Sequence, residues 1–193
     1  MDNPGAKRSR AYHRYFEGYT ELYDEKGKIQ RAYTEDYYLY SGNRLLYKLL
    51  VLALYMAGTV SFLEAAWMNL PMNHFWLFSV LEAVTVMLAA VVGIYVAGFL
   101  FTPKKLKLRE YRNATERLPG WCTALMAAEL VLFVAAAVFS IATKRNGQGN
   151  LLCCFLLFLS GALTTVLRYV QKQAQFETEE NPLKGKVIGS KIF

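Results

Sequence analysis

The stretch FWLFSVLEAVTVMLAAVVGIYVAGFLF, residues 75–101, decides the fold. It carries only one charged side chain, Glu82. A helix of about 20 apolar residues is long enough to cross the ~30 Å hydrocarbon layer of a bilayer. This stretch is therefore expected to be a membrane span.

Three further stretches have the same character, and together the four make up about half of the 193 residues. The predicted spans are residues 45–68, 75–101, 121–142 and 151–170. The sequence thus predicts an all-α membrane protein with a four-helix transmembrane domain at 45–170, preceded by a segment 1–44 and followed by a basic tail 171–193. Hydrophobic residues make up 54% of the chain and charged residues 19%, which leaves no room for a large soluble catalytic domain.

The distribution of lysine and arginine predicts the orientation. Residues 1–44 carry eight of them, residues 102–120 six and the tail after Val170 four, whereas the other two connections carry only Lys144 and Arg145. Basic flanks of short loops stay on the cytoplasmic side. Both termini are therefore expected in the cytoplasm. No cleaved signal peptide, lipidation motif or retrieval signal is recognised, which favours a bacterial cytoplasmic membrane.

Short loops after the first and third spans predict two antiparallel helical hairpins that pack as one bundle. Small residues allow close helix contact in lipid, and they recur here every four residues. The expected packing residues are Ala53, Ala57, Ser61 and Ala65 on the first span, and Ala89, Gly93 and Ala97 on the second. Alternatively, one of these rows contacts another protein or a second copy of the chain.

Three carboxylates lie within the predicted spans: Glu64, Glu82 and Glu129. Acidic residues inside a membrane are costly and are functional candidates by default. Helical phase relative to the small residues predicts that all three face the bundle interior. They either carry protons or cations, or form hydrogen bonds that fix the helix register, or meet an intramembrane residue of a partner.

The segment before the first span is rich in tyrosine, with eight of the chain's 13 tyrosines between Tyr12 and Tyr40. Strand-forming residues flank the polar turn DEKGK at 24–28, so the sequence predicts a β-hairpin with strands at about 15–23 and 29–37. A lone hairpin is marginal in water. It is expected to pack against the helix ends, lipid headgroups or another protein, or to pair with the C-terminal KVIGSKIF as a third strand. The candidate partner surface is Tyr15, Tyr19, Tyr23, Tyr33 and Tyr37.

The basic connection between the second and third spans is a candidate lipid-binding site. Its Lys104, Lys105, Lys107 and Arg109 would attract anionic headgroups. The same residues are also what the orientation rule requires of an inner loop. No nucleic-acid-binding motif accompanies them, and a nucleic-acid partner is not expected.

The sequence contains no pattern that predicts an enzyme. The three cysteines and two histidines fall at positions that cannot converge on one metal ion, and no nucleophile, paired-acid or phosphate-binding motif is present. No cofactor or metal is expected. The three cysteines are interpreted as small packing residues.

These observations favour a non-enzymatic multi-pass membrane protein that acts as an interaction or assembly subunit through its aromatic cytoplasmic segment. Its partners would be the lipid bilayer and another membrane or cytoplasmic protein, or a second copy of the chain. The alternative is a small oligomeric transporter or a proton- or cation-translocating protein that uses the intramembrane glutamates.

Overall fold

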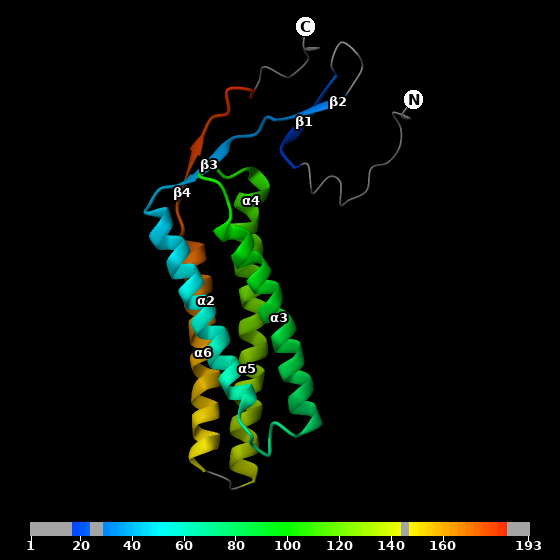
Figure 1. Ribbon diagram of the computed structural model, residues 1–193, viewed down its shortest axis with the longest axis vertical. Helices are drawn as coiled ribbons and strands as arrows, with labels where there is room; N and C mark the ends of the chain where they lie inside the picture. The colour runs from blue at the N-terminus through cyan, green and yellow to red at the C-terminus, as the bar shows by residue number, and fades with distance from the viewer. Residues whose placement is uncertain (1–16, 24–28, 144–146, 185–193) are drawn as a thin grey trace. The chain divides into compact units, whose positions relative to one another are not determined.

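The chain divides into two compact units (Figure 1). The computed structural model describes residues 17–23, 29–143 and 147–184. A helical unit comprises Gly42–Phe101 and Asn113–Ala174. The second unit, here called the β-unit, takes its residues from three separate segments: Met1–Ser41, Thr102–Arg112 and Gln175–Phe193.

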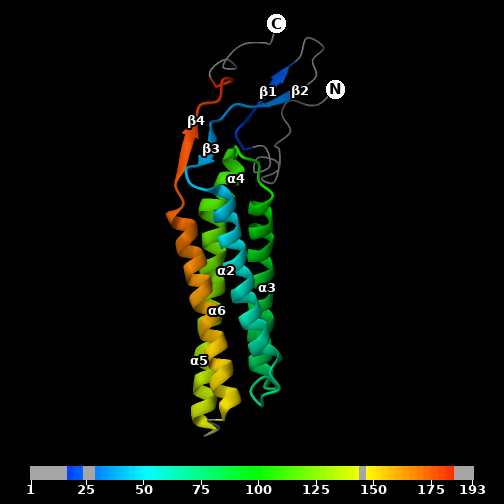
Figure 2. The same ribbon diagram turned by 60° about the vertical axis from the view of Figure 1, so that its left-hand side comes forward.

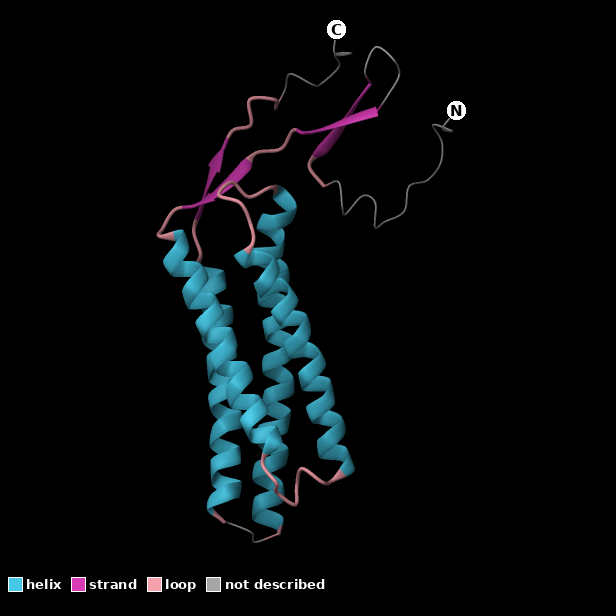
Figure 3. Ribbon diagram, viewed as in Figure 1, coloured by secondary structure: helices cyan, strands magenta, loops and turns pink. Residues whose placement is uncertain are grey.

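The helical unit consists of four long helices (Figure 3). They are α2 (Arg44–Trp67), α3 (Trp76–Leu100), α5 (Leu118–Ala142) and α6 (Gln148–Gln173). Each of the four is long and apolar enough to cross a membrane. The four predicted stretches are thus confirmed as helices. The main difference is that α5 and α6 each begin three residues earlier than predicted, and α6 also ends three residues later.

Polar side chains define several helix ends. The Asn43 side chain accepts a hydrogen bond of 3.2 Å from the backbone N–H of Leu46 and so caps the start of α2. At the other end, Asn73 Nδ2 donates to three carbonyl groups of the α2 terminus at 2.7 to 3.2 Å. The carbonyls of Ala65 and Met68 also accept backbone N–H groups, from Met68 at 3.4 Å and Leu70 at 2.8 Å, so Asn73 adds to the backbone bonds at this helix end. A π-helical turn, Asn113–Arg117, precedes α5, and Pro119 occupies its first turn, where no N–H is needed.

The buried residues of the helices recur in alternating steps of three and four. On α6 they are Asn150, Cys153, Leu157, Ser160, Thr164, Leu167 and Gln171. The buried residues of α5 from Leu118 to Ala136 and those of α3 from Thr85 to Phe99 follow the same spacing. An average spacing of 3.5 residues is that of left-handed bundles with crossing angles of about 20°.

Helix α6 is central to this packing, because it makes extensive contacts with both α2 and α5 (Figures 1 and 2). Helix α3 packs mainly on α5. The predicted antiparallel hairpin of α5 and α6 is therefore a close-packed pair. The predicted pairing of α2 with α3 is weaker than expected, since α2 contacts α6 far more than α3.

The spacing also corrects part of the small-residue prediction. Ser61, Ala65 and Ala89 are buried, but Ala53, Ala57 and Ala97 are exposed. A row of residues four apart drifts by about 40° per step around a helix of 3.6 residues per turn. Such a row leaves the buried face after two or three steps, whereas alternating steps of three and four remain on it. Contact of the exposed alanines with another chain stays a prediction.

In its described residues, the β-unit has two antiparallel two-stranded sheets and one short helix. Strands β1 (Tyr19–Tyr23) and β2 (Ile29–Tyr33) form the first sheet, with Tyr19 opposite Tyr33. Strands β3 (Tyr37–Tyr40) and β4 (Phe176–Glu179) form the second. Helix α4 (Leu108–Arg112) belongs to the inner segment, and Leu106 pairs with Tyr38 on β3.

The predicted hairpin is thus present in a shorter form. Tyr37 does not extend β2, because the chain turns after Tyr33 and Tyr37 starts a separate strand. The expected third strand, KVIGSKIF at 186–193, lies outside the described residues. The strand that the C-terminal segment contributes is β4, which begins at Phe176, three residues after α6 ends at Gln173.

Candidate functional site

Glu129 is the acidic residue that the helical unit buries. Its side chain lies on α5 with only 2% of the residue exposed. It is the twelfth residue of a 25-residue helix, about 16 Å from the start at a rise of 1.5 Å per residue. The carboxyl group therefore lies close to the middle of α5.

A serine connects this carboxyl group to two other helices. The Ser160 hydroxyl on α6 contacts Glu129 Oε1 and also lies 3.0 Å from the carbonyl oxygen of Gly58 on α2. A hydroxyl has one proton and can donate to only one of these acceptors. It donates to Glu129 when the carboxyl group is ionised. When the carboxyl group is protonated, Glu129 donates to Ser160, which in turn donates to Gly58.

The second carboxyl oxygen, Glu129 Oε2, is buried and makes no hydrogen bond of normal geometry within the described residues. Thr164 of the next turn of α6 lies beside the carboxyl group. In the part of the chain that the structure describes, Glu129 also has no ion pair. An unsatisfied buried polar atom is uncommon in proteins and calls for an explanation.

Glu129 lines a groove of about 250 Å³ between α5 and α6. The other lining residues are almost entirely apolar: Met126, Leu130, Phe133, Leu157, Phe158, Gly161 and Ala162, with Thr165. A Cβ atom at Gly161 would lie 3.8 Å from the Glu129 Cβ, an ordinary van der Waals distance, so Gly161 lies beside Glu129 in the lining of the groove. The site is one acidic group in an apolar groove.

The other buried polar groups along α6 do not continue this site. About 15 Å of helix separates Ser160 from Asn150 at 1.5 Å per residue, and Cys153 and Leu157, 1% and 2% exposed, fill that interval. Toward the other end, Leu167 separates Thr164 from Gln171. Apolar layers therefore isolate the polar groups from one another.

The other two acids lie elsewhere than predicted. Glu82 is half-buried. Glu64 is exposed, which corrects the expectation that it faces the bundle interior, and it lines a shallow depression with Val60, Leu63 and Trp67. Its position is roughly 110° around the helix axis from the centre of the buried face of α2. Polar side chains near these acids bind backbone groups: Ser61 and Thr85 donate to carbonyls of their own helices, and Asn73 caps α2.

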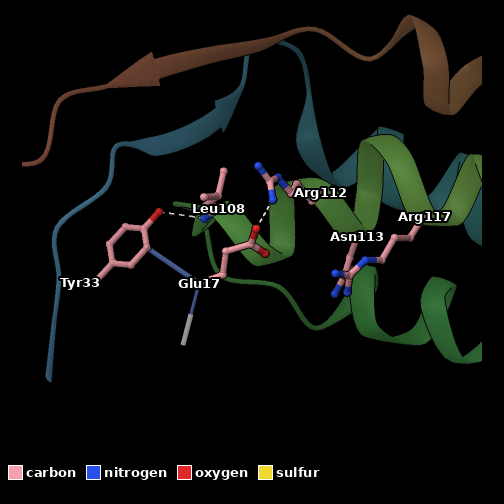
Figure 4. Close-up of polar contacts among 6 residues, drawn as sticks. All are labelled: Glu17, Tyr33, Leu108, Arg112, Asn113 and Arg117. Atoms are coloured by element: carbon pink, nitrogen blue, oxygen red, sulfur yellow. Dashed lines mark hydrogen bonds and ion pairs between the residues drawn. The ribbon is translucent and has the colours of Figure 1, made fainter. Parts of the chain in front are cut away.

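The β-unit has its own buried polar centre at Tyr33, which is 6% exposed. Its hydroxyl donates to the Asp36 carbonyl at 2.8 Å. The same hydroxyl accepts from the N–H of Leu108 at 2.8 Å, as Figure 4 shows. Burial raises the pKa of Tyr33 to about 12. Gly18, with φ of 82°, packs against the ring so closely that a Cβ atom there would lie 2.8 Å from it. The sequence placed Tyr33 on a recognition surface, whereas it is a core residue.

Asn181 completes this centre from the C-terminal segment. Its Nδ2 donates to the carbonyls of Tyr33 at 2.8 Å and Glu35 at 3.1 Å, and its Oδ1 accepts from the N–H of Leu183 at 3.0 Å. The residue is 4% exposed. No local pattern around Asn181 indicated this role, because its partners lie almost 150 residues earlier in the chain.

Among the described residues, three ion pairs connect the segments of the β-unit, one for each pair of segments. Glu17 pairs with Arg112 (Figure 4), Lys105 with Glu179, and Asp36 with Lys184. Hydrogen bonding to Lys184 lowers the pKa of Asp36. Partly exposed pairs of this kind stabilise a protein only slightly. They matter here because each of the three segments is paired with both of the others.

Aromatic contacts also connect the three segments of the β-unit. Tyr38 of the first segment stacks on Tyr111 of the inner segment with ring centroids 4.0 Å apart, and Phe176 of the last segment packs edge-on against Tyr111 at 5.3 Å. Tyr40 also contacts Phe176, at 5.7 Å. This aromatic cluster therefore contains residues of all three segments.

The predicted lipid-binding lysines take part in these contacts. Lys107 Nζ donates to the Tyr19 hydroxyl at 2.5 Å and lies 5.7 Å from the Tyr33 ring centroid. The bond to Tyr19 raises the pKa of Lys107. Lys105 pairs with Glu179 and lies over the Tyr37 ring at 5.9 Å, while Lys104 is exposed and Arg109 half-buried. Tyr15 lies outside the described residues, as does the side chain of Tyr23.

The cysteines are free: Cys122 and Cys153 are buried and Cys154 is half-buried. Within the described residues, no group of three or more His, Cys, Asp or Glu side chains could hold a metal ion. No protein-family model, curated protein or solved structure matches the chain.

Proposed function

We propose that the chain is a non-enzymatic, multi-pass membrane protein that presents the β-unit in the cytoplasm as an interaction or assembly module. The observation that supports this most is the way the β-unit is built. Three segments, separated by pairs of long apolar helices, are joined by ion pairs, aromatic contacts and the buried Asn181 side chain. Ordering three segments costs conformational entropy that anchoring in a membrane does not require. A folded module of this kind indicates a function of its own.

The placement in the cytoplasm rests on charge. The segments of the β-unit hold most of the lysine and arginine residues of the chain, including the inner connection between α3 and α5. Short, basic connections remain on the cytoplasmic side of a membrane. The connections at the opposite helix ends are short and nearly free of basic residues.

The most suitable recognition surface is the open edge of β4. Strand β3 has β4 on one side and Leu106 on the other, whereas β4 pairs only with β3 in the part of the chain that the structure describes. An unpaired strand edge offers backbone donors and acceptors to an added strand of a partner. The exposed residues Glu177 and Thr178 flank this edge.

Site-specific photo-crosslinking tests the proposal. A benzophenone amino acid placed at Thr178 on β4 should form an adduct with a protein in native membranes, and Asn181→Ala should reduce the yield of that adduct by destabilising the β-unit. The same amino acid at Ile94, which is 71% exposed on α3, is the matched control and should react with lipid. A third position, Ala57, tests the rival interpretation of a helix contact with a second chain. Protein adducts from Ala57 or Ile94 but not from Thr178 would contradict the proposal.

Translocation of protons or cations is the second candidate function. The buried Glu129 favours it, and the apolar layers on both sides of Ser160 and Thr164 oppose it. The substitution Glu129→Gln keeps the size of the side chain and removes its ionisation. If wild-type proteoliposomes show a flux and the variant shows the same flux, translocation through Glu129 is excluded.

A further inference from the structure

The groove between α5 and α6 has the composition of a small-molecule site. Its volume is about 250 Å³, and an acidic side chain lies among apolar walls. A cavity of about 150 Å³ accommodates a benzene-sized molecule, so this groove accommodates an apolar body of roughly ten non-hydrogen atoms. Binding sites of this kind combine apolar walls with a few polar groups that orient the ligand.

The acceptor that a ligand could satisfy is Glu129 Oε2, which has almost no accessible surface, so the carboxyl group must turn toward the groove to meet a ligand. Oε1 is occupied by Ser160, whereas Oε2 is buried and accepts no hydrogen bond. Gly161 presents no side chain between this group and the groove. A ligand that donates a hydrogen bond would therefore satisfy this buried oxygen.

The charge and the aromatic walls select the kind of donor. Glu129 has no ion pair within the described chain, so a cation bound here would be its counterion. The rings of Phe133 and Phe158 border the groove with centroids 5.9 Å apart. Aromatic faces attract an ammonium group, most strongly where water is excluded. Ser160 can then donate its proton to Oε1 while the ammonium group donates to Oε2.

We propose that this groove binds a lipophilic amine in its protonated form, with the ammonium group on Glu129 and the apolar body between α5 and α6. This role is independent of the interaction module proposed above. It requires only the helical unit, and the two proposals fail separately because one concerns Glu129 and the other β4.

The experiment measures binding of tritiated 4-phenylbutylamine to the full chain in nanodiscs of phosphatidylcholine, with 4-phenylbutan-1-ol as the neutral competitor of equal size. The expected result is saturable binding at one site that the alcohol displaces at least tenfold less well. Glu129→Gln should weaken binding at least tenfold. Gly161→Leu should do the same by filling the groove without altering the carboxyl group. Thermal unfolding shows that each variant is folded.

Glu64→Gln is the matched control. Glu64 is also an intramembrane acid beside a depression, of about 300 Å³, but its side chain is exposed. Binding in this variant should equal that of the wild type. Absence of saturable binding, equal affinity for the alcohol, wild-type binding by folded Glu129→Gln, or an equal loss in Glu64→Gln would each overturn the proposal.

Discussion

Replacing Asn181 by alanine should open the β-unit while leaving the helices folded. The substitution removes three hydrogen bonds, to Tyr33, Glu35 and Leu183, and all of them are 2.8 to 3.1 Å long. Each contributes about 1 kcal/mol, so the free energy of opening the β-unit should fall by about 3 kcal/mol. Every 1.4 kcal/mol changes an equilibrium constant about tenfold, so the open population should rise roughly 100-fold.

Hydrogen exchange detected by mass spectrometry measures this change directly. The amides of Tyr38 and Leu106 donate to each other's carbonyls at 3.0 and 2.9 Å and report on the β-unit away from the substitution. Their exchange should accelerate by the same factor of roughly 100, because exchange follows the open population. The amides of α5 and α6 should remain within twofold of the wild type.

Asn43→Ala provides the matched control, since it removes one hydrogen bond of an asparagine, at the start of α2. Loss of a helix cap costs about 1 kcal/mol and should affect only the first turn of that helix. If Asn181→Ala accelerates exchange at Tyr38 and Leu106 less than threefold, or only in residues 181–184, Asn181 does not hold the three segments together. Equal acceleration in the helices would show that the two units open together.

Three further predictions concern single residues. Gly93→Ala should destabilise the helical unit by about 1 to 3 kcal/mol in thermal unfolding, because the new Cβ atom would lie 2.3 Å from the Tyr55 hydroxyl oxygen. Adding Tyr55→Phe to this variant should restore part of the lost stability. Gly98→Ala is the control and should leave the stability unchanged, because a Cβ atom there would have nothing within 4 Å. Because the pKa of Asp36 is lowered in the folded state, its ionised form stabilises the β-unit at pH values above about 4, the ordinary carboxyl pKa. This stability should be lost as the pH falls through the lower folded-state pKa. Hydrogen exchange measured across this pH range should show the loss in the wild type and not in Asp36→Asn. The raised pKa of Tyr33 makes the β-unit lose stability as pH rises from about 10, the ordinary tyrosine pKa, to about 12, and Tyr33→Phe should remove one tyrosinate absorbance change near pH 12.

The positions of the long helices could be predicted because each apolar stretch is a local property of the chain. Their rotational phase could not be predicted from the small residues alone. The row Ala53, Ala57, Ser61, Ala65 suggested a repeat of four, but the bundle uses alternating steps of three and four, so Ala53 and Ala57 face outward and Glu64 with them. Gly58, which contacts Ser160, lies outside that row and was missed.

In the β-unit, too, local sequence patterns predicted local structure but not the pairing of distant segments. Strand-forming residues on both sides of a polar turn predicted the hairpin of β1 and β2. The partner of β3 could not be predicted, because β4 lies more than 130 residues later in the chain and is a short polar strand, FETE. Of the candidate site, the burial of Glu129 was predicted, but its bond to Ser160 and its groove depend on how α6 packs against α5.

The central claim is that the chain crosses a membrane four times, with the β-unit on the cytoplasmic face and the turn after α5 on the opposite face. Labelling of single cysteines with a membrane-impermeant maleimide tests it directly, in a chain whose three native cysteines are replaced by alanine. Glu35 in the β-unit and Thr143 at the end of α5 are both exposed and serve as the two positions. In intact cells, Thr143→Cys should react, and Glu35→Cys should react only after the membrane is permeabilised. Reaction of both positions from the same side would contradict the four crossings.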